Sequence, residues 1–366
     1  MDELIEEILI RLPPEEPAYL VRATLVCKAW RTMLSDSSHG GFLRRYREFH
    51  GTPPMLGYLR NSFCHQPQFV AATSTACPPL SMPEASDHDV RWCVLDCRHG
   101  HVLITDDGCY GPAGIRFIVW DPITRGMHHL VLPGHHPYSC TAAAVLCAID
   151  ACDHLDCRSG PFPVVLVENH PVNEEVPNNE GHVAWASVYS LETDAWSAAS
   201  TSIVVRFPIG GWTPSLLIGD ALYFTSSGWH TLDILKYDLG SHGLSMIDAP
   251  RVPPNAVAMK AHDGGLGFVA MSGNRLYLMS RQATGAWARH KTTDLGTTLL
   301  PRHPRQLFVY GDGMDTVFIT TEEGLFTLNL KSRQVRKVAK REDCYLAVPY
   351  MSFFTPKVCL APAWGL

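Results

Sequence analysis

Charged residues are scarce in this chain of 366 residues: they make up 18% of it, against roughly 25% in average proteins. The formal net charge of −6 lacks the basic excess of a general nucleic-acid binder, so no nucleic-acid partner is expected. Long apolar runs are missing too. The longest, residues 142–149, spans about 8 residues, whereas a membrane helix needs about 20. We therefore expect no membrane partner.

Common catalytic motifs are also missing. The chain contains no GxSxG, GxxxxGK[ST] or HExxH pattern, so we expect neither enzyme activity nor a cofactor. The opening Met1-Asp2-Glu3 lacks the positive charge and apolar stretch of a signal peptide. We expect the chain in the cytoplasm and/or nucleus, with its 12 cysteines reduced.

The Cys-x2-Cys spacing that marks many zinc sites does not occur either. Two groups of cysteine and histidine nevertheless lie close in the sequence. The spacing favours ordinary buried or loop cysteines over metal ligands, and no metal site is expected. The two groups are Cys93, Cys97, His99 and His101, and Cys147, Cys152, Asp153, His154 and Cys157.

Residues 1–48 have the pattern of a small helical domain. Leu4, Ile8 and Leu12 repeat with helical spacing, and Pro13-Pro14 should end the first helix. A second helix is expected to start near Pro17 and to run with an apolar stripe towards residues 33–34. So short a unit cannot bury all of its apolar side chains internally, which indicates a protein partner.

Residues 53–366 have a different pattern, with short strand-like runs separated by turn residues. Five similar units carry a polar residue at the tip of a hairpin, and the tips are 71, 46, 44 and 49 residues apart. A period in the forties is typical of β-propeller blades. The tip residues are Asp121, Glu192, Asp238, Gln282 and Lys331.

Two segments remain without a partner in these five units, residues 55–59 and 347–354. We expect them to pair as a sixth blade and to close the ring, which removes free sheet edges. The gap of 71 residues is interpreted as an insert at about 147–182, forming a long surface loop, although the first strand of the second unit is expected at residues 163–167. The predicted fold is mainly β, with a small α-helical N-terminal domain followed by a kelch-like β-propeller of about six blades.

The helical segment resembles the F-box. The resemblance rests on Leu12-Pro13 and, at the expected distance, on Leu25-Val26-Cys27-Lys28 and Trp30. The remainder resembles the propeller-like region of a grass-type plant F-box family. The sequence motifs that carry this resemblance are Val119-Trp120-Asp121-Pro122, Gly219-Asp220-Ala221-Leu222-Tyr223-Phe224, Tyr237-Asp238-Leu239 and Pro349-Tyr350-Met351-Ser352-Phe353.

The resemblance implies a substrate-receptor subunit of a Skp–cullin–F-box ubiquitin ligase. The F-box would bind a Skp-family adaptor, and through it a cullin scaffold, while the propeller would hold a target protein for ubiquitination. The chain itself would carry no chemistry, because raising the local concentration of target lysines is enough. The residues that match the adaptor-binding motif are Leu4, Ile5, Ile8, Leu12, Pro13, Leu20, Leu25, Val26, Cys27, Lys28 and Trp30.

Some of these apolar residues could instead pack the helices together, and Trp30 is the preferred anchor because tryptophan is enriched in interface hot spots. Trp212 and Trp229 lie in Gly-rich loops and are candidate target contacts. The Leu-Pro pair that usually precedes the first helix of the family is not found before Asp2. A ligase-independent binding module with a degenerate F-box is therefore an alternative, and a propeller hydrolase is another.

Overall fold

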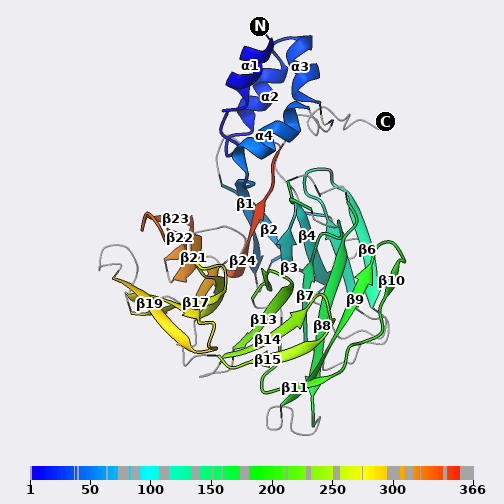
Figure 1. Ribbon diagram of the computed structural model, residues 1–366, viewed down its shortest axis with the longest axis vertical. Coiled ribbons are helices and arrows are strands. Elements are labelled where there is room, and N and C mark those ends of the chain that lie inside the picture. The colour runs from blue at the N-terminus through cyan, green and yellow to red at the C-terminus, as the bar shows by residue number, and fades with distance from the viewer. Residues whose placement is uncertain are drawn as a thin grey trace.

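In the computed structural model of the chain, a bundle of helices stands on one side of a ring of antiparallel sheets (Figure 1). The bundle contains α1 (Asp2–Leu9), α2 (Ala18–Thr24), α3 (Lys28–Leu34) and α4 (Phe42–His50). No helix in the described part of the chain is long and apolar enough to cross a membrane. The structure describes residues 2–36, 38, 41–62, 65–72, 82–83, 91–106, 115–132, 140–149, 152–155, 157, 160–173, 181–210, 213–227, 232–249, 256–273, 275–294, 306–309, 316–321, 323–340 and 344–354.

The helical bundle differs from the sequence prediction in one respect. The expected second helix, which was to run from Pro17 towards residues 33–34, is interrupted and forms α2 and α3. The break occurs at Cys27, whose backbone is extended and whose sulfur accepts a hydrogen bond from the Trp30 amide at 3.5 Å. A residue that caps the start of a helix has non-helical backbone angles. The helix before Cys27 therefore cannot continue through it into α3.

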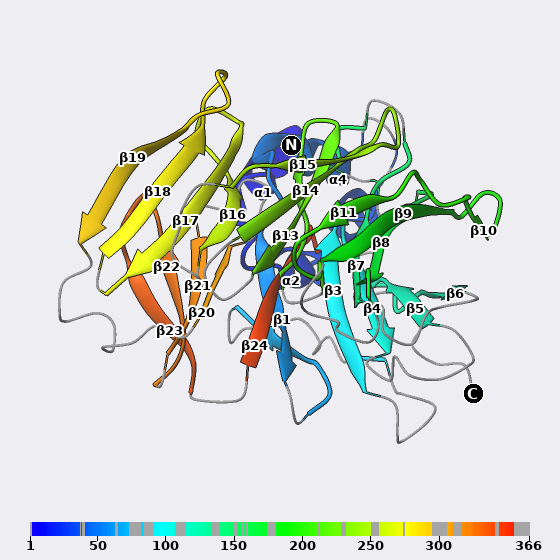
Figure 2. The ribbon, with the colours of Figure 1, turned by 90° about the horizontal axis from the view of Figure 1, so that it is seen from below.

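The ring consists of six sheets, counted within the described residues and seen end-on in Figure 2. Blade 1 contains β3 (Trp92–Arg98), β4 (His101–Asp106), β5 (Ile115–Trp120) and β6 (Met127–Leu132). Blade 2 contains β7 (Cys140–Val145), β8 (Pro163–Pro171), β9 (His182–Ser190) and β10 (Ala195–Trp196), with β11 (Ile203–Val205) also paired to β9. Blade 3 contains β12 (Leu216–Ile218), β13 (Ala221–Ser227), β14 (Leu232–Asp238) and β15 (Leu244–Ile247).

The remaining blades complete the ring. Blade 4 contains β16 (Val257–Lys260), β17 (Leu266–Ser272), β18 (Arg275–Arg281) and β19 (Trp287–Asp294). Blade 5 contains β20 (Gln306–Val309), β21 (Thr316–Thr321), β22 (Gly324–Asn329) and β23 (Val335–Lys340). Blade 6 contains β24 (Cys344–Met351), β1 (Met55–Ser62) and β2 (Gln68–Ala71).

The six-bladed propeller confirms the predicted fold class. Four of the predicted tip residues lie in the turn between the third and fourth strands of their blades, and Asp238 is the last residue of the third strand of blade 3. The sixth blade joins the two ends of the propeller sequence, because β1 pairs with β24 in antiparallel register, with Leu59 opposite Val348. A strand from each end in one sheet removes the free edges that an open ring would expose.

The interpretation of residues 147–182 as one long surface loop is wrong at β8, whereas the strand expected at residues 163–167 is confirmed. This range contains β8, which pairs with β7 on one side and β9 on the other. The Val164 to Val167 run is fully buried, because a strand in the middle of a blade is covered on both faces and therefore reads as continuously apolar. The extra length of this unit is instead divided between the segments before and after β8.

A buried polar network joins the inner strands of three blades. The Asp96 carboxylate on β3 forms an ion pair with Arg98 and accepts a hydrogen bond from the Val145 amide of blade 2 at 2.9 Å. The Arg98 guanidinium donates to the Ser215 hydroxyl, just before blade 3, at 3.0 Å. Because each buried charge is paired and hydrogen-bonded, the network ties the blades together without an isolated buried charge.

Candidate functional site

The first helix presents two apolar side chains to solvent. Leu4 and Ile8 lie one turn apart on α1, and 71% and 66% of their surfaces are exposed. The opposite face is anchored, because Leu9 is buried and Glu6 forms an ion pair with Arg45 of α4. A helix with one face packed and a second apolar face exposed has the form expected of a protein-binding element.

The junction between α2 and α3 presents a second exposed apolar pair. Leu25 is 73% exposed and Val26 is 63% exposed. The Leu25 amide donates to the Arg22 carbonyl at 3.0 Å, and the Val26 amide donates to Ala23 at 3.2 Å. These turn hydrogen bonds hold both side chains outward, so their burial would have to come from another molecule.

The core of the bundle is formed by residues other than these exposed apolar ones. Leu20 and Leu34 are buried together with Phe42 and Tyr46 of α4. Burial, and to a lesser degree the nearby Glu15, raises the pKa of Tyr46. Its hydroxyl therefore stays protonated and donates to the Leu12 carbonyl at 2.9 Å. This hydrogen bond fixes the end of the first helical segment against α4.

The structure divides the predicted adaptor-binding residues into three groups by exposure. The solvent-facing group could contact a partner directly, the half-buried group packs against the helical core, and the buried residue cannot reach a partner without unfolding. Exposed are Leu4, Ile8, Pro13, Leu25, Val26, Cys27 and Lys28; half-buried are Ile5, Leu12 and Trp30; buried is Leu20.

Two exposed aromatic residues were missed by the sequence reasoning. Tyr19 on α2 is partly exposed, and so is Phe49 on α4, which lies beyond the predicted end of the helical domain at residue 48. Tyr19 directly precedes the buried Leu20, whereas Phe49 lies between the exposed Glu48 and the half-buried His50. The two predicted target contacts, Trp212 and Trp229, lie outside the described residues.

The helical bundle is fastened to the propeller. Phe353, just after β24, belongs to the helical core, and its ring packs edge-on against Tyr46 at a centroid distance of 6.2 Å. Arg44 of α4 forms an ion pair with Asp153, which lies between β7 and β8. A pocket of about 200 Å³ at this junction is lined by residues of both parts, including Arg47, His99 and His154. The contacts fix the exposed helical faces relative to the ring.

Comparison with known proteins covers both parts of the chain. Among solved structures, a chain of a nidogen/laminin complex has a TM-score of 0.44 and 10% identity, covering 81% of this chain and 98% of that one. TolB from Acinetobacter baumannii has a TM-score of 0.44 and 12% identity, covering 83% and 69%. A protein from Lactobacillus plantarum has a TM-score of 0.43 and 12% identity, covering 80% and 99%. These likenesses are too distant to carry a functional argument.

No curated protein matches the chain. Two family models do match it. The F-box domain model covers residues 2–39, which include α1 to α3, and the model described as "F-box protein AT5G49610-like, beta-propeller" covers residues 93–358. The second match spans well over half of the chain and includes the strands of blades 1 to 5 except Trp92, the first residue of β3. The chain therefore belongs to the family of F-box proteins with an AT5G49610-like β-propeller.

Proposed function

We propose that this chain is the substrate receptor of a Skp–cullin–F-box ubiquitin ligase. F-box and propeller domains together are typical of non-enzymatic adaptor proteins, and the F-box supports binding of a Skp-family adaptor in general. In the proposed complex, the helical bundle binds that adaptor and through it a cullin scaffold. The propeller holds a target protein, so that a separate enzyme can ubiquitinate the lysines of the target.

The observation that carries the proposal is the exposure of apolar side chains within the F-box match. Leu4, Ile8, Leu25 and Val26 all lie in residues 2–39 and face solvent. Fully burying one such side chain yields about 1.5–3 kcal/mol. The chain therefore offers a partner several apolar contacts, while its fold depends on a separate set of buried residues such as Leu20.

The fixed junction between the bundle and the propeller supports the same proposal. A receptor accelerates ubiquitination by holding the target near the charged enzyme, which requires a defined distance between the two binding surfaces. Phe353 and the Arg44–Asp153 ion pair supply contacts that restrict relative movement of the two parts. The predicted target contacts Trp212 and Trp229 stay part of the proposal, as do action in the cytoplasm and/or nucleus and membership of the grass-type branch of plant F-box proteins.

The test is a binding experiment between the purified full-length chain and a Skp-family adaptor. We expect the wild-type chain to form a complex that survives size-exclusion chromatography, and the variant Ile8→Asp/Leu25→Asp to elute separately. Val204→Asp is the matched control, because Val204 is an equally exposed apolar residue on β11 of the propeller. Circular dichroism of each variant checks that the fold is retained.

Absence of binding by folded wild-type chain would contradict the ligase proposal and favour a ligase-independent binding module. If the Ile8→Asp/Leu25→Asp variant binds the adaptor as tightly as the wild-type chain does, the exposed apolar pairs are not the contact surface. When binding is established, a reconstituted ligase with this chain should ubiquitinate proteins captured by the propeller. The Ile8→Asp/Leu25→Asp variant should capture the same proteins without ubiquitinating them.

A further inference from the structure

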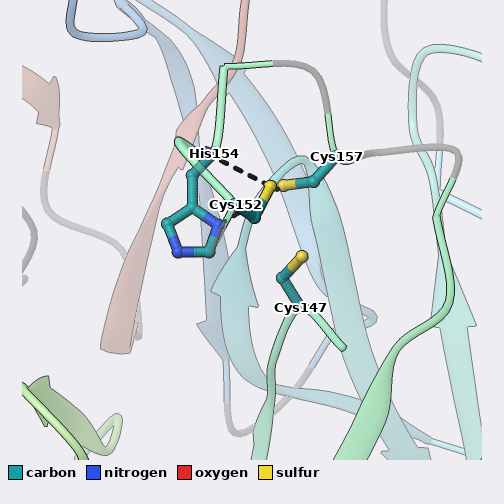
Figure 3. A group of neighbouring side chains, drawn as sticks. All are labelled: Cys147, Cys152, His154 and Cys157. Carbon is teal, nitrogen blue, oxygen red and sulfur yellow. Dashed lines mark hydrogen bonds between the residues drawn. The ribbon is translucent and has the colours of Figure 1, made fainter. Parts of the chain in front are cut away.

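Four side chains with soft ligand atoms converge in the segment between β7 and β8 (Figure 3). Three thiols and one imidazole, spread over eleven positions of the sequence, place one ligand atom each within 4.8 Å of all the others. The Cys/His cluster consists of Cys147, Cys152, His154 and Cys157.

The spacing of the cluster suits a tetrahedral zinc ion. Zinc lies about 2.3 Å from thiolate sulfur and about 2.0–2.1 Å from imidazole nitrogen, so its ligand atoms are about 3.8 Å apart at the corners of the tetrahedron. The Cys157 sulfur and the His154 Nδ1 atom are already 3.7 Å apart. The others need to move inward by at most about 1 Å to reach zinc geometry. A loop can make such an adjustment through side-chain rotation.

The backbone around the Cys/His cluster is arranged to support negative charge on sulfur. The Ile149 amide donates to the Cys147 sulfur at 3.4 Å, and the His154 amide donates to the Cys152 sulfur at 3.4 Å. The His154 backbone has φ of 57°, a left-handed conformation that is uncommon outside glycine. Amide hydrogen bonds to ligand sulfurs are a recurrent outer layer of metal–thiolate sites, where they orient the ligand and tune its charge.

The electrostatics of the Cys/His cluster also favour a cation. The three sulfur atoms and the imidazole nitrogen lie within 4.8 Å of one another. Three thiolates cannot share this space by themselves because their charges repel, whereas a bound divalent cation deprotonates its thiols outright. The closeness of these ligand atoms therefore suits a site that a cation occupies.

The donor set identifies the metal and its role. Three sulfurs and one nitrogen in a tetrahedron are typical of zinc, while calcium and magnesium require oxygen ligands. With all four positions taken by protein, the site has no open position for a substrate and is of the structural type. The sequence spacing, Cys-x4-Cys-x-His-x2-Cys, lacks the usual Cys-x2-Cys pair. For this reason the sequence alone gave no expectation of a metal.

The segment that carries the Cys/His cluster is also the one that contacts the helical bundle. Asp153, between two cluster residues, forms the ion pair with Arg44 of α4. Leu155, between His154 and Cys157, packs against the helical core. Whatever fixes the conformation of this loop therefore fixes a contact between the bundle and the propeller.

We propose that the Cys/His cluster binds one zinc ion, which holds the β7–β8 loop in the shape that docks α4 onto the propeller. This structural site is independent of adaptor binding. Zinc sites of this type contribute folding free energy directly, because the preformed site exists only in the folded chain. Removing the metal should loosen the junction first and leave the distant blades 4 and 5 unchanged.

The test uses tag-free, full-length chain purified without chelators. Elemental analysis should find one zinc per chain, and replacement by cobalt should give the visible bands of tetrahedral Co²⁺ together with thiolate-to-cobalt charge transfer. Cys152→Ser should weaken zinc affinity by more than about 100-fold, since even loss of an outer-layer contact costs about 10–100-fold. Cys140→Ser, on β7 but outside the Cys/His cluster, is the matched control and should bind zinc as the wild type does.

Hydrogen exchange then tests the proposed role. Chelation of the wild-type chain should increase exchange in α4 and the β7–β8 loop but not in blades 4 and 5, and added zinc should reverse the increase. The proposal is overturned if folded wild-type chain contains no zinc and takes up no cobalt with charge-transfer bands. It is also overturned if zinc is present but equally retained by Cys152→Ser, as expected for a site on surface histidines. A disulfide between cluster residues in chain purified under reducing conditions would overturn it too.

Discussion

Shortening Leu25 to alanine should weaken adaptor binding without disturbing the fold. In the free chain 73% of Leu25 is exposed, so an adaptor that covers it removes most of the side chain from water. Leucine to alanine deletes three carbon groups, each worth about 0.8 kcal/mol when buried. Scaled by the exposed fraction, the loss is about 1.8 kcal/mol of binding free energy, or about 20-fold in Kd. The free energy of unfolding should change little, since the deleted atoms contact mainly solvent.

Isothermal titration calorimetry of the full-length chain with a Skp-family adaptor measures this loss. Two controls separate binding from folding. Val204→Ala, at a position that is 62% exposed but lies on the propeller, should bind as the wild type does. Leu20→Ala should instead lower the free energy of unfolding by about 2–5 kcal/mol, because Leu20 is 2% exposed in the helical core. A Leu25→Ala chain with wild-type Kd would refute the assignment of this surface to the adaptor.

Three further predictions concern the propeller. Replacing Arg98 with methionine leaves Asp96 buried without its ion-pair partner and should cost about 3–5 kcal/mol in the free energy of unfolding; an unchanged urea midpoint would contradict this. The Asp121 carboxylate accepts hydrogen bonds from the amides of residues 123 and 124 at 2.8 and 3.2 Å. Asp121→Ala should therefore destabilise the chain by about 1–3 kcal/mol in thermal or chemical melts, whereas Asp121→Asn, which keeps the acceptor, should cost less. Burial, and then the charge of His170, lowers the pKa of His182 below its ordinary 6.5. As the pH falls, His182 is therefore protonated in the unfolded chain at a higher pH than in the folded chain. The stability due to neutral His182 is complete above about pH 6.5 and declines as the pH falls below it. His182→Gln should flatten this part of the profile of melting temperature against pH, and an unaltered profile would show that His182 is not the group responsible.

The helical bundle shows where a periodic pattern stops being informative. Leu20 and Leu25 both match the F-box motif, yet one is buried in the core and the other faces solvent. The pattern cannot separate them because a unit of this size uses apolar residues both for its own core and for its interface. The break between α2 and α3 depends on the cap that Cys27 provides, which a stripe of apolar residues does not reveal.

The sequence by itself determined the repeat. Polar tips separated by 46, 44 and 49 residues after a first gap of 71, together with two unmatched end segments, were sufficient to predict blades and ring closure. Hairpin turns and strand alternation are local properties of the chain. The strand at residues 163–167 was also expected, but only the tertiary structure decided that it continues to Pro171 and lies in the middle of blade 2. It alone brought four separate cysteine and histidine side chains together beside α4. The physical reason is that burial arises from contacts between residues distant in the chain. The convergence of the four ligand atoms depends on the path of the loop backbone, and spacing in the sequence specifies neither.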